Sequence, residues 1–257
     1  MRNYFLAVSL ILFLLFPSSG IPESLSFAEM ENAGQVLSLA DPAGKNENTA
    51  RRAFIDDMLE TAKKRFDETH GRPQRAQNSG DIYICKNFTV HLFRENCKKY
   101  RMSEYPDVSL IIPNNRKKAE CLPYAYGVSW EEISAEKGNP FEIVAEFRYD
   151  EEKSPEENRE AALALLREVQ RGDFFQMSAK YYYGIGAHSL VFIADYDPKS
   201  NEVRWTDSNM KGFSKGGVRY AYVQYDAVRD IGWFADAFCQ KKRGATLYRL
   251  REDIEMR

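Results

Sequence analysis

The chain has 257 residues, 44% of them hydrophobic and 13% aromatic, which is enough apolar material for a sizeable core. Its 36 Lys and Arg nearly balance its 38 Asp and Glu, and the formal net charge is −2. This balance argues against a nucleic-acid partner, and the short basic runs Arg116–Lys118 and Lys241–Arg243 are typical of solvated surface.

The N-terminus has the pattern of an export signal. Arg2 supplies a positive charge, Phe5–Phe16 is apolar apart from Ser9, and small residues that suit a cleavage site follow up to Gly20. The apolar run is shorter than the roughly 20 residues that a membrane-spanning helix needs. We predict a signal peptide over residues 1–20 and an exported protein of the periplasm or the extracellular space, free or associated with the cell envelope. No stable membrane span is expected after signal removal, although a single arginine leaves an uncleaved anchor as the alternative.

A linker or weakly ordered arm is predicted over residues 21–50, which are rich in small and polar residues with prolines and glycines. The first helix is predicted over Arg51–Thr69, because apolar residues recur there at helical spacing: Phe54, Ile55, Met58, Leu59 and Ala62. His70 and Gly71 end this helix. Residues 74–80 are predicted to form a polar loop.

A second helix is predicted over Cys85–Lys99, with Cys85 in its first turn. The N-terminus of a helix presents unpaired N–H groups and the positive end of the helix dipole, and both stabilise a thiolate. Because Cys85 shares a face with Phe88 and Leu92, a buried structural cysteine is the alternative. His91 lies on a different face of the same helix, so it is a poor candidate for a base acting on Cys85.

Residues 101–153 carry no motif, and we predict an insertion or a lid there. Three elements are expected within or at the end of this region: a strand at Val108–Ile112, a short helix at Trp130–Lys137 and an edge strand at Glu142–Tyr149.

The sequence Ser-Pro-Glu-Glu that begins at Ser154 is a capping box with proline at the first helical position. It predicts a helix over Pro155–Arg171, and Gly172 is expected to be the C-terminal cap of that helix.

The stretch from Gly172 to Asn209 predicts an antiparallel meander of three strands. A Gly-Asp turn enters the first strand, His188 begins the second, and the third is expected to end on Asp207 and Asn209. Three elements are predicted after it: a strand at Val218–Tyr225, a helix or broken segment at Tyr225–Phe238 and a strand at Ala245–Leu250. Helices followed by a meander of strands predict an α+β fold with an antiparallel sheet.

The meander predicts a histidine beside a polar strand end. His188 should lie close to Asp207 or Asn209, because the start of one strand and the end of the next meet in a hairpin. A histidine oriented in this way can take the proton of a thiol and later protonate a leaving group, and Cys85 supplies the thiol. The residues leave open whether Asp207 or Asn209 orients the histidine. They also leave structural alternatives, a satisfied core histidine at His188 and a turn residue at Asp207.

The arrangement resembles the NlpC/P60 and CHAP groups of cysteine hydrolases, which share a papain-like core. In those families a cysteine opens a helix packed on an antiparallel sheet, a Gly-Asp pair leads into a strand, a histidine starts the next strand, and a polar residue closes the strand after that. Similar parts of this chain are Gly172-Asp173-Phe174-Phe175, Ala187-His188-Ser189-Leu190-Val191 and Asp207-Ser208-Asn209. The resemblance implies a papain-like domain over residues 51–257, with Cys85 as nucleophile, His188 as base and Asp207 as the orienting residue, assisted or replaced by Asn209.

The resemblance also implies an activity, the hydrolysis of peptide or amide bonds through an acyl-cysteine intermediate, with peptidoglycan or a peptide as substrate. Tyr83 is expected to donate to an oxyanion, as tyrosines near the cysteine do in NlpC/P60 relatives. Tyr183, in a loop of three tyrosines, is predicted either to line the substrate groove or to cover the sheet. Two other functions remain open, a transglutaminase-like acyl transferase and a catalytically inactive or binding domain of the same fold in the cell envelope.

The remaining cysteines and histidines predict no further chemistry. With Cys85 as the nucleophile, at most one disulfide can form among Cys97, Cys121 and Cys239. The three histidines are spread along the chain, and no Cys-x-x-Cys or His-Glu-x-x-His motif and no phosphate-binding glycine loop occurs. We therefore predict neither a metal nor a cofactor.

Overall fold

The computed structural model describes residues 48–76, 82–110, 138–179, 188–213, 219–240 and 243–257. Several predictions from the sequence lie outside these segments: the signal peptide over residues 1–20, nearly all of the arm over residues 21–50, the helix at 130–137, Tyr183 and Cys121. The described residues form an α+β fold with four α-helices, a seven-stranded sheet and a two-stranded sheet, as the sequence predicts in outline.

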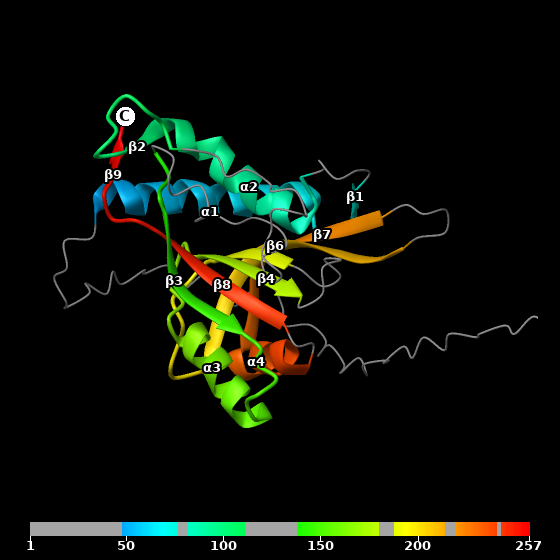
Figure 1. The fold of residues 1–257 in the computed structure, drawn as a ribbon. Helices are drawn as coiled ribbons and strands as arrows, with labels where there is room; N and C mark the ends of the chain where they lie inside the picture. The colour runs from blue at the N-terminus through cyan, green and yellow to red at the C-terminus, as the bar shows by residue number, and fades with distance from the viewer. Residues whose placement is uncertain (1–47, 77–81, 111–137, 180–187, 214–218, 241–242) are drawn as a thin grey trace, which may run out of the picture. The chain divides into compact units, whose positions relative to one another are not determined.

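The large sheet has the strand order β1-β7-β6-β5-β4-β8-β3, and all its described pairings are antiparallel. Its strands are β1 (Gln74–Ala76), β3 (Phe141–Arg148), β4 (Phe174–Ala179), β5 (His188–Phe192), β6 (Glu202–Phe213), β7 (Arg219–Asp230) and β8 (Arg243–Leu250). Strands β4 to β7 form a meander, after which the chain crosses back and inserts β8 between β4 and β3 (Figure 1). The small sheet pairs β2 (Tyr100–Met102) with β9 (Ile254–Met256).

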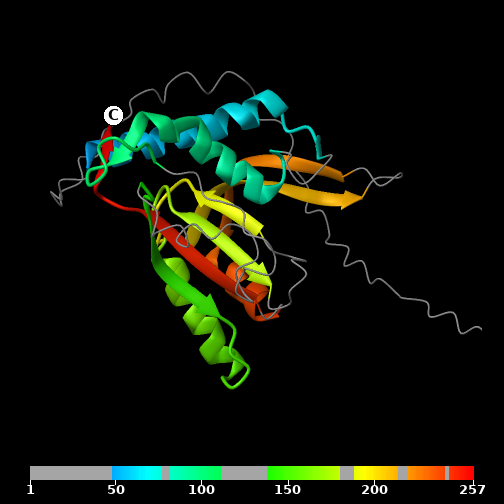
Figure 2. The same cartoon turned by 45° about the horizontal axis from the view of Figure 1, so that its top comes forward.

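Helices cover both faces of the large sheet. Helices α1 (Thr49–Thr69) and α2 (Cys85–Asn96) lie side by side on one face, and α3 (Pro155–Arg167) and α4 (Ile231–Gln240) lie on the other, as both views of the ribbon show (Figures 1 and 2). A 3₁₀ turn (Cys97–Lys99) follows α2 and leads into β2. The sheet is therefore the middle layer of three.

Two hydrophobic clusters fill the spaces between these layers. Val191 of β5 belongs to the cluster beneath α1 and α2, whereas its neighbours Leu190 and Phe192 belong to the cluster against α3 and α4. This alternation is the side-chain period of a strand that is buried on both faces. Each fully buried aliphatic or aromatic side chain stabilises the fold by roughly 1.5–3 kcal/mol, before conformational entropy is counted.

The first helix agrees with its prediction within two residues. Asn48 caps its start, where the side-chain Oδ1 accepts a hydrogen bond from the backbone N–H of Ala50 at 2.8 Å. The helix ends at His70, whose backbone is left-handed with φ of 49°. His70 is thus the helix cap and not part of a catalytic arrangement.

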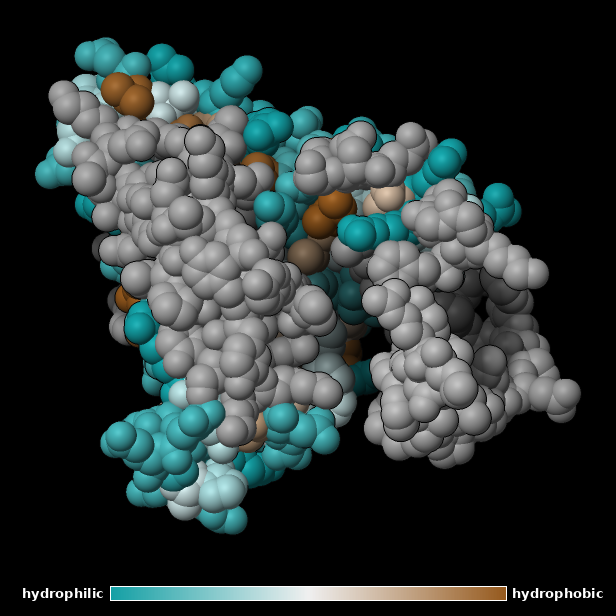
Figure 3. Space-filling model, turned by 45° about the vertical axis from the view of Figure 1, so that its right-hand side comes forward, coloured by the Kyte–Doolittle hydropathy of each residue, from teal (hydrophilic) through white to brown (hydrophobic). Residues whose placement is uncertain are grey.

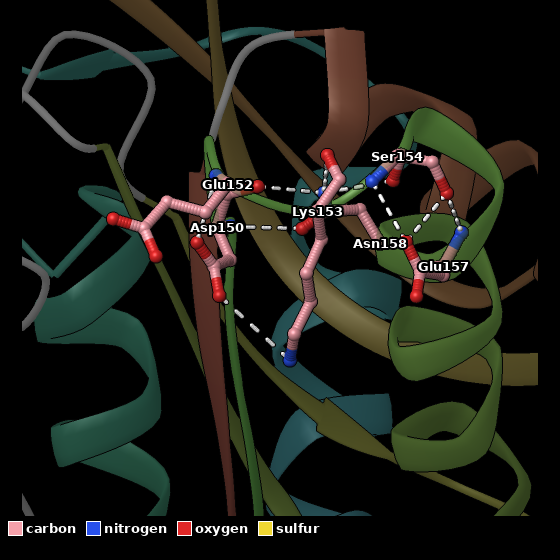
Figure 4. Close-up of polar contacts among 6 residues, drawn as sticks. All are labelled: Asp150, Glu152, Lys153, Ser154, Glu157 and Asn158. Atoms are coloured by element: carbon pink, nitrogen blue, oxygen red, sulfur yellow. Dashed lines mark hydrogen bonds and ion pairs between the residues drawn. The ribbon is translucent and has the colours of Figure 1, made fainter.

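The capping box predicted at Ser154 is present (Figure 4). The backbone N–H of Glu157 donates to Oγ of Ser154 at 3.2 Å, and the backbone N–H of Ser154 donates to the Glu157 carboxylate at 2.9 Å. The buried side-chain amide of Asn158 holds the preceding turn, since it bonds both backbone groups of Asp150 at 2.8 Å. These contacts fix the direction in which the chain passes from β3 into α3.

Gly172 does not cap α3, so that prediction is wrong. The helix ends at Arg167 with Glu168 as its cap, and Gly172 lies in the turn that enters β4. It has φ of +88°, and a Cβ atom there would lie 2.7 Å from Cγ1 of Ile55. Glycine is required because α1 packs directly against this turn.

Asp173 does more than complete the Gly-Asp turn. Its carboxylate is fully buried and forms a bidentate ion pair with Arg249 of β8, at 2.9 Å from Nε to Oδ1 and 2.7 Å from Nη2 to Oδ2. It also accepts the backbone N–H of Gln170 at 2.9 Å. This ion pair joins the start of β4 to β8.

Several strand boundaries differ from the prediction. Strand β6 continues to Phe213, so Asp207 lies in its middle and not at its end. Strand β7 continues to Asp230, which leaves a shorter helix α4 than the predicted segment. Residues 74–76, predicted as loop, form β1, and the predicted strand at residues 108–112 is reduced, within the described part, to a single bridge at Ser109. The edge strand and the last predicted strand are confirmed as β3 and β8.

The described surface is mainly hydrophilic on the face that Figure 3 shows, with isolated hydrophobic residues between polar ones. Across the described residues the large exposed hydrophobic side chains are Ile143, Trp233 and Met256. Among the helices that the structure describes, none combines the length and the hydropathy needed to cross a membrane.

Candidate active site

Helix α2 begins at the residue predicted to be the nucleophile. Ile84 precedes it with an extended backbone and provides no side-chain cap, and the first helical hydrogen bond runs from Phe88 N–H to Ile84 C=O at 2.8 Å. The half-buried Cys85 therefore lies among the N–H groups of the first turn. Ser208 of β6 donates its hydroxyl to the carbonyl of Tyr83 at 2.7 Å, which ties the turn before the cysteine to the sheet.

His188 is the first described residue of β5, as predicted, and its ring contacts a carboxylate. Its Nε2 lies 2.7 Å from Oδ2 of Asp207. The side chain of Asp207 is 3% exposed and that of His188 14% exposed, so water competes little for this bond. The prediction that β5 and β6 bring these residues side by side is confirmed, although Asp207 reaches the histidine from the middle of its strand.

The thiol of Cys85 forms the third part of the arrangement, since it interacts with His188 closely enough for each side chain to shift the pKa of the other. Because Nε2 of the ring faces Asp207, Nδ1 is the nitrogen left for the sulfur. The structure therefore joins Cys85, His188 and Asp207 in one continuous chain of contacts, drawn from α2, β5 and β6.

These contacts shift the two titrations in opposite directions. Burial acts to raise the pKa of the Cys85 thiol, but the hydrogen bond and charge of His188, with backbone contacts from Ser189 and Lys86, outweigh burial and lower that pKa below its ordinary value. Burial acts to lower the pKa of His188, yet its bonds to Asp207 and Cys85 raise that pKa to about 10. Both shifts favour the thiolate and imidazolium forms of the pair, and the two groups titrate as a coupled pair.

Asp207, and not Asn209, is the candidate that contacts the histidine. Both residues lie on β6 and Asn209 is half-buried, but among the described contacts the ring of His188 bonds only to Asp207 and Cys85. Asp207 accepts two further N–H groups, from Trp205 Nε1 at 3.0 Å to Oδ2 and from Gln224 Nε2 at 2.9 Å to Oδ1. Both carboxylate oxygens are thus occupied in a site that is nearly closed to water.

Sequence reasoning missed the residues around this chain of contacts. Gln176 of β4 is buried, accepts the Ser189 hydroxyl at 2.5 Å and donates to the carbonyl of His188 at 3.1 Å, which holds the start of β5. Trp205 could have been found, because it lies two residues before Asp207 and so on the same face of an extended strand. Gln224 could not, because only the register between β6 and β7 places it opposite Asp207.

Tyr83 and His91, the other described residues that the sequence analysis considered for the site, lie outside the contacts among Cys85, His188 and Asp207. Tyr83 is half-buried and packs against the cluster beneath α1 and α2, two residues before Cys85. His91 lies on α2 and bonds to Arg65 of α1, with 3.0 Å between Nε of the arginine and Nε2 of the ring. Burial, followed by the charge of Arg65, lowers the pKa of His91.

Three described cysteines, Cys85, Cys97 and Cys239, are free thiols. Burial raises the pKa of Cys97 and of Cys239, so neither shares the activation of Cys85. In the segments that the structure describes, no group of three or more His, Cys, Asp or Glu side chains is arranged to hold a metal ion.

Protein-family models, curated proteins and solved structures were each searched, and none matches the chain.

Proposed function

We propose that this protein is an exported cysteine hydrolase with a papain-like core, which cleaves peptide or amide bonds in peptidoglycan through an acyl-cysteine intermediate. The observation that carries the proposal is the continuous contact from Cys85 at the start of α2, through His188, to the buried carboxylate of Asp207. The papain-like core and the substrate rest on the sequence resemblance, and export rests on the apolar N-terminal pattern.

The first half of the reaction starts from the Cys85 thiolate and the His188 imidazolium. The Cys85 thiolate attacks the carbonyl carbon, a C–S bond forms, and the carbonyl electron pair moves to oxygen. His188 then donates its proton to the leaving nitrogen, the C–N bond breaks, and an amine leaves while the acyl group stays on sulfur. The lowered pKa of Cys85 and the raised pKa of His188 favour the charge state that this step requires.

The second half reverses the role of the histidine. His188 is now neutral and takes a proton from water, whose oxygen attacks the thioester carbon. The C–S bond breaks, a carboxylic acid product leaves, and the thiolate–imidazolium pair is restored. Asp207 keeps the ring in one orientation through both halves, because its bond to Nε2 leaves Nδ1 directed at the sulfur.

The oxyanion of each tetrahedral intermediate needs hydrogen-bond donors. The start of α2 offers backbone N–H groups beside the sulfur, and the positive end of the helix dipole favours negative charge there. Tyr83 is the proposed side-chain donor, because it lies two residues before Cys85, next to the N-cap residue Ile84. A Tyr83→Phe variant is expected to reduce kcat more than it changes KM, since the donor acts on charge that exists only in the transition state.

Digestion of purified peptidoglycan by the full chain tests the proposal. Soluble fragments are identified by mass spectrometry, with Cys85→Ala and His188→Ala as inactive variants and Cys239→Ala as the matched control. The proposal predicts new fragments, each carrying a free carboxyl group from the cleaved amide, that neither inactive variant releases and that the control releases normally.

Added amine separates hydrolysis from acyl transfer. Acyl groups found on ethanolamine in place of water would identify an acyl transferase with the same nucleophile. Binding to peptidoglycan without any acyl-cysteine, together with an unreactive Cys85, would instead identify a binding domain. If the protein hydrolyses small peptide amides but leaves peptidoglycan uncleaved, the proposed hydrolase activity stands and peptidoglycan is rejected as its substrate.

A further inference from the structure

The carboxylate of Asp207 is held from three sides. Oδ2 accepts from His188 at 2.7 Å and from Trp205 at 3.0 Å, while Oδ1 accepts from Gln224 at 2.9 Å. A carboxylate with one partner can rotate about its terminal torsion, which has a broad energy profile. With donors on both oxygens, rotation would break at least one charge-assisted hydrogen bond in a buried site, so the direction of Oδ2 is fixed.

The sheet presents Gln224 to Asp207 through a bulge. Trp205 pairs with Ala227 and Asp207 with Gln224, so two steps along β6 correspond to three steps along β7. In a regular antiparallel register Asp207 would face Tyr225, which has no amide to donate. The extra residue of β7 places an amide donor opposite the carboxylate.

Both donors are themselves held in place. The indole of Trp205 is 8% exposed and packs edge-to-face on Phe234 of α4, with ring centroids 5.2 Å apart. The hydroxyl of Thr206 donates to the backbone carbonyl of Gln224 at 2.8 Å, which fixes the strand at that position. Among the described contacts neither Trp205 nor Gln224 bonds to the histidine, whereas both bond to Asp207, which bonds to the ring.

We infer that Trp205 and Gln224 are positioning residues of this site: their N–H groups orient the Asp207 carboxylate, which orients His188 toward Cys85. The inference rests on the proposed function, since it concerns the same nucleophile and base. According to the inference, the reactivity of Cys85 depends on two residues beyond Cys85, His188 and Asp207. The β7 bulge also has a role in the chemistry, because it places Gln224 opposite Asp207.

The test is the pH dependence of Cys85 alkylation by iodoacetamide in the full chain, followed by mass mapping of each cysteine. Gln224→Met and Trp205→Phe each remove one N–H donor and keep most of the side-chain volume. If a donor is lost and the ring turns away, the pKa of the thiol returns toward its ordinary value. At a pH well below the wild-type pKa of Cys85, a rise of one unit in that pKa lowers the alkylation rate by about tenfold.

Tyr100→Phe is the matched control, because it removes the hydroxyl of a buried ring that donates to the Asp57 carboxylate at 3.1 Å, and it leaves every described contact of Asp207 and Gln224 in place. Thermal unfolding is measured for all variants, so that a general loss of stability is recognised. We expect both donor variants to slow alkylation at low pH, the double variant to slow it further, and the control to keep the wild-type pH profile.

Failure of this inference and failure of the proposed function give different results. If wild-type Cys85 reacts at low pH and both folded donor variants react equally fast or faster, the positioning role is wrong and the proposed function stands. If wild-type Cys85 shows no activation, the proposed function is wrong and the inference falls with it. An equal shift in Tyr100→Phe would mean that general stability, and not the N–H groups donated to Asp207, sets the profile, which also overturns the inference.

Discussion

Nε2 of His188 and Oδ2 of Asp207 lie 2.7 Å apart, in side chains that come from two neighbouring strands. This one bond decides how the ring is used. It occupies Nε2 and leaves Nδ1 free to face Cys85, which lies at the start of α2 and whose pKa the histidine lowers. Among the described contacts, the nucleophile and the orienting carboxylate are therefore linked through the histidine.

Selective alkylation is the first prediction. At about pH 6, iodoacetamide should modify Cys85 and leave Cys97 and Cys239 unmodified, because the pKa of Cys85 is lowered while burial raises the pKa of the other two. Mass mapping of the digested protein measures each site separately. His188→Ala should remove the selectivity, and Cys97 reacting as fast as Cys85 in the wild type would contradict the prediction.

The pH profile of activity is the second prediction. Below the lowered pKa of Cys85 the thiol is protonated, so kcat/KM should rise as pH increases through that pKa. Above about 10, the raised pKa of His188, the ring loses the proton that the leaving amine needs, so activity should fall there. A profile that rises continuously through about pH 10 would show that no imidazolium is required.

The same pair makes a contribution to stability with a defined sign. The pKa of His188 is raised above its ordinary 6.5, so its contribution is fully present below about that pH and is lost as pH rises through about 10. Asp207→Asn removes the largest charged cause of the shift. Unfolding free energies of the wild type and this variant should therefore converge at high pH, and a difference that grows with pH would contradict the sign.

Another prediction separates Asp207 from Asn209. Asp207→Ala should reduce kcat by about 100-fold or more, since a histidine without its orienting partner is a poor proton-transfer group. Asn209→Ala should have a much smaller effect, because its side chain does not bond to His188 in the described structure. Steady-state kinetics on one substrate compares them, and equal losses would mean that Asn209 also acts on the site.

The parts of the site that local sequence signals govern could be predicted. Cys85 at a helix start and His188 at a strand start are visible because turns, caps and changes of periodicity mark the ends of elements. Asp207 was placed near His188 for the right reason, the pairing of adjacent strands. Its expected place at a strand end was wrong, because β6 and β7 continue well beyond the site as a long pair.

What could not be predicted depends on contacts between distant parts of the chain. Gln224 faces Asp207 only because of a bulge that no local pattern marks. Strand β1 has no alternating apolar residues and exists through its pairing with β7. The sequence predicts Gly172 as a helix cap, but this glycine, with its positive φ, instead allows α1 to approach closely at Ile55, which only the packed structure reveals.

A further prediction concerns the buried ion pair between Asp173 and Arg249. Arg249→Met leaves a buried carboxylate without its partner and should destabilise the fold by about 3–5 kcal/mol. The double variant with Asp173→Asn should recover part of this loss. Arg159→Met, which breaks an exposed ion pair with Asp236, is the control and should cost no more than about 1 kcal/mol. Denaturant unfolding measures all three, and equal losses for Arg249→Met and Arg159→Met would contradict the prediction.

The last prediction tests the bulge of β7 directly. Asp226 lies in the bulge with φ of 62°, and its carboxylate is held by Arg204 of β6, with 2.6 Å between Nε and Oδ1. Valine is strained in this left-handed conformation, whereas glycine adopts it readily. Asp226→Val should therefore shift the strand register and displace Gln224 from Asp207, which slows Cys85 alkylation at low pH. Asp226→Gly loses the exposed pair with Arg204 but should keep the wild-type pH profile of alkylation. If both variants remain folded and both keep that profile, the bulge does not position the carboxylate. If Asp226→Gly alone disturbs the profile, the ion pair with Arg204 matters more than the backbone conformation.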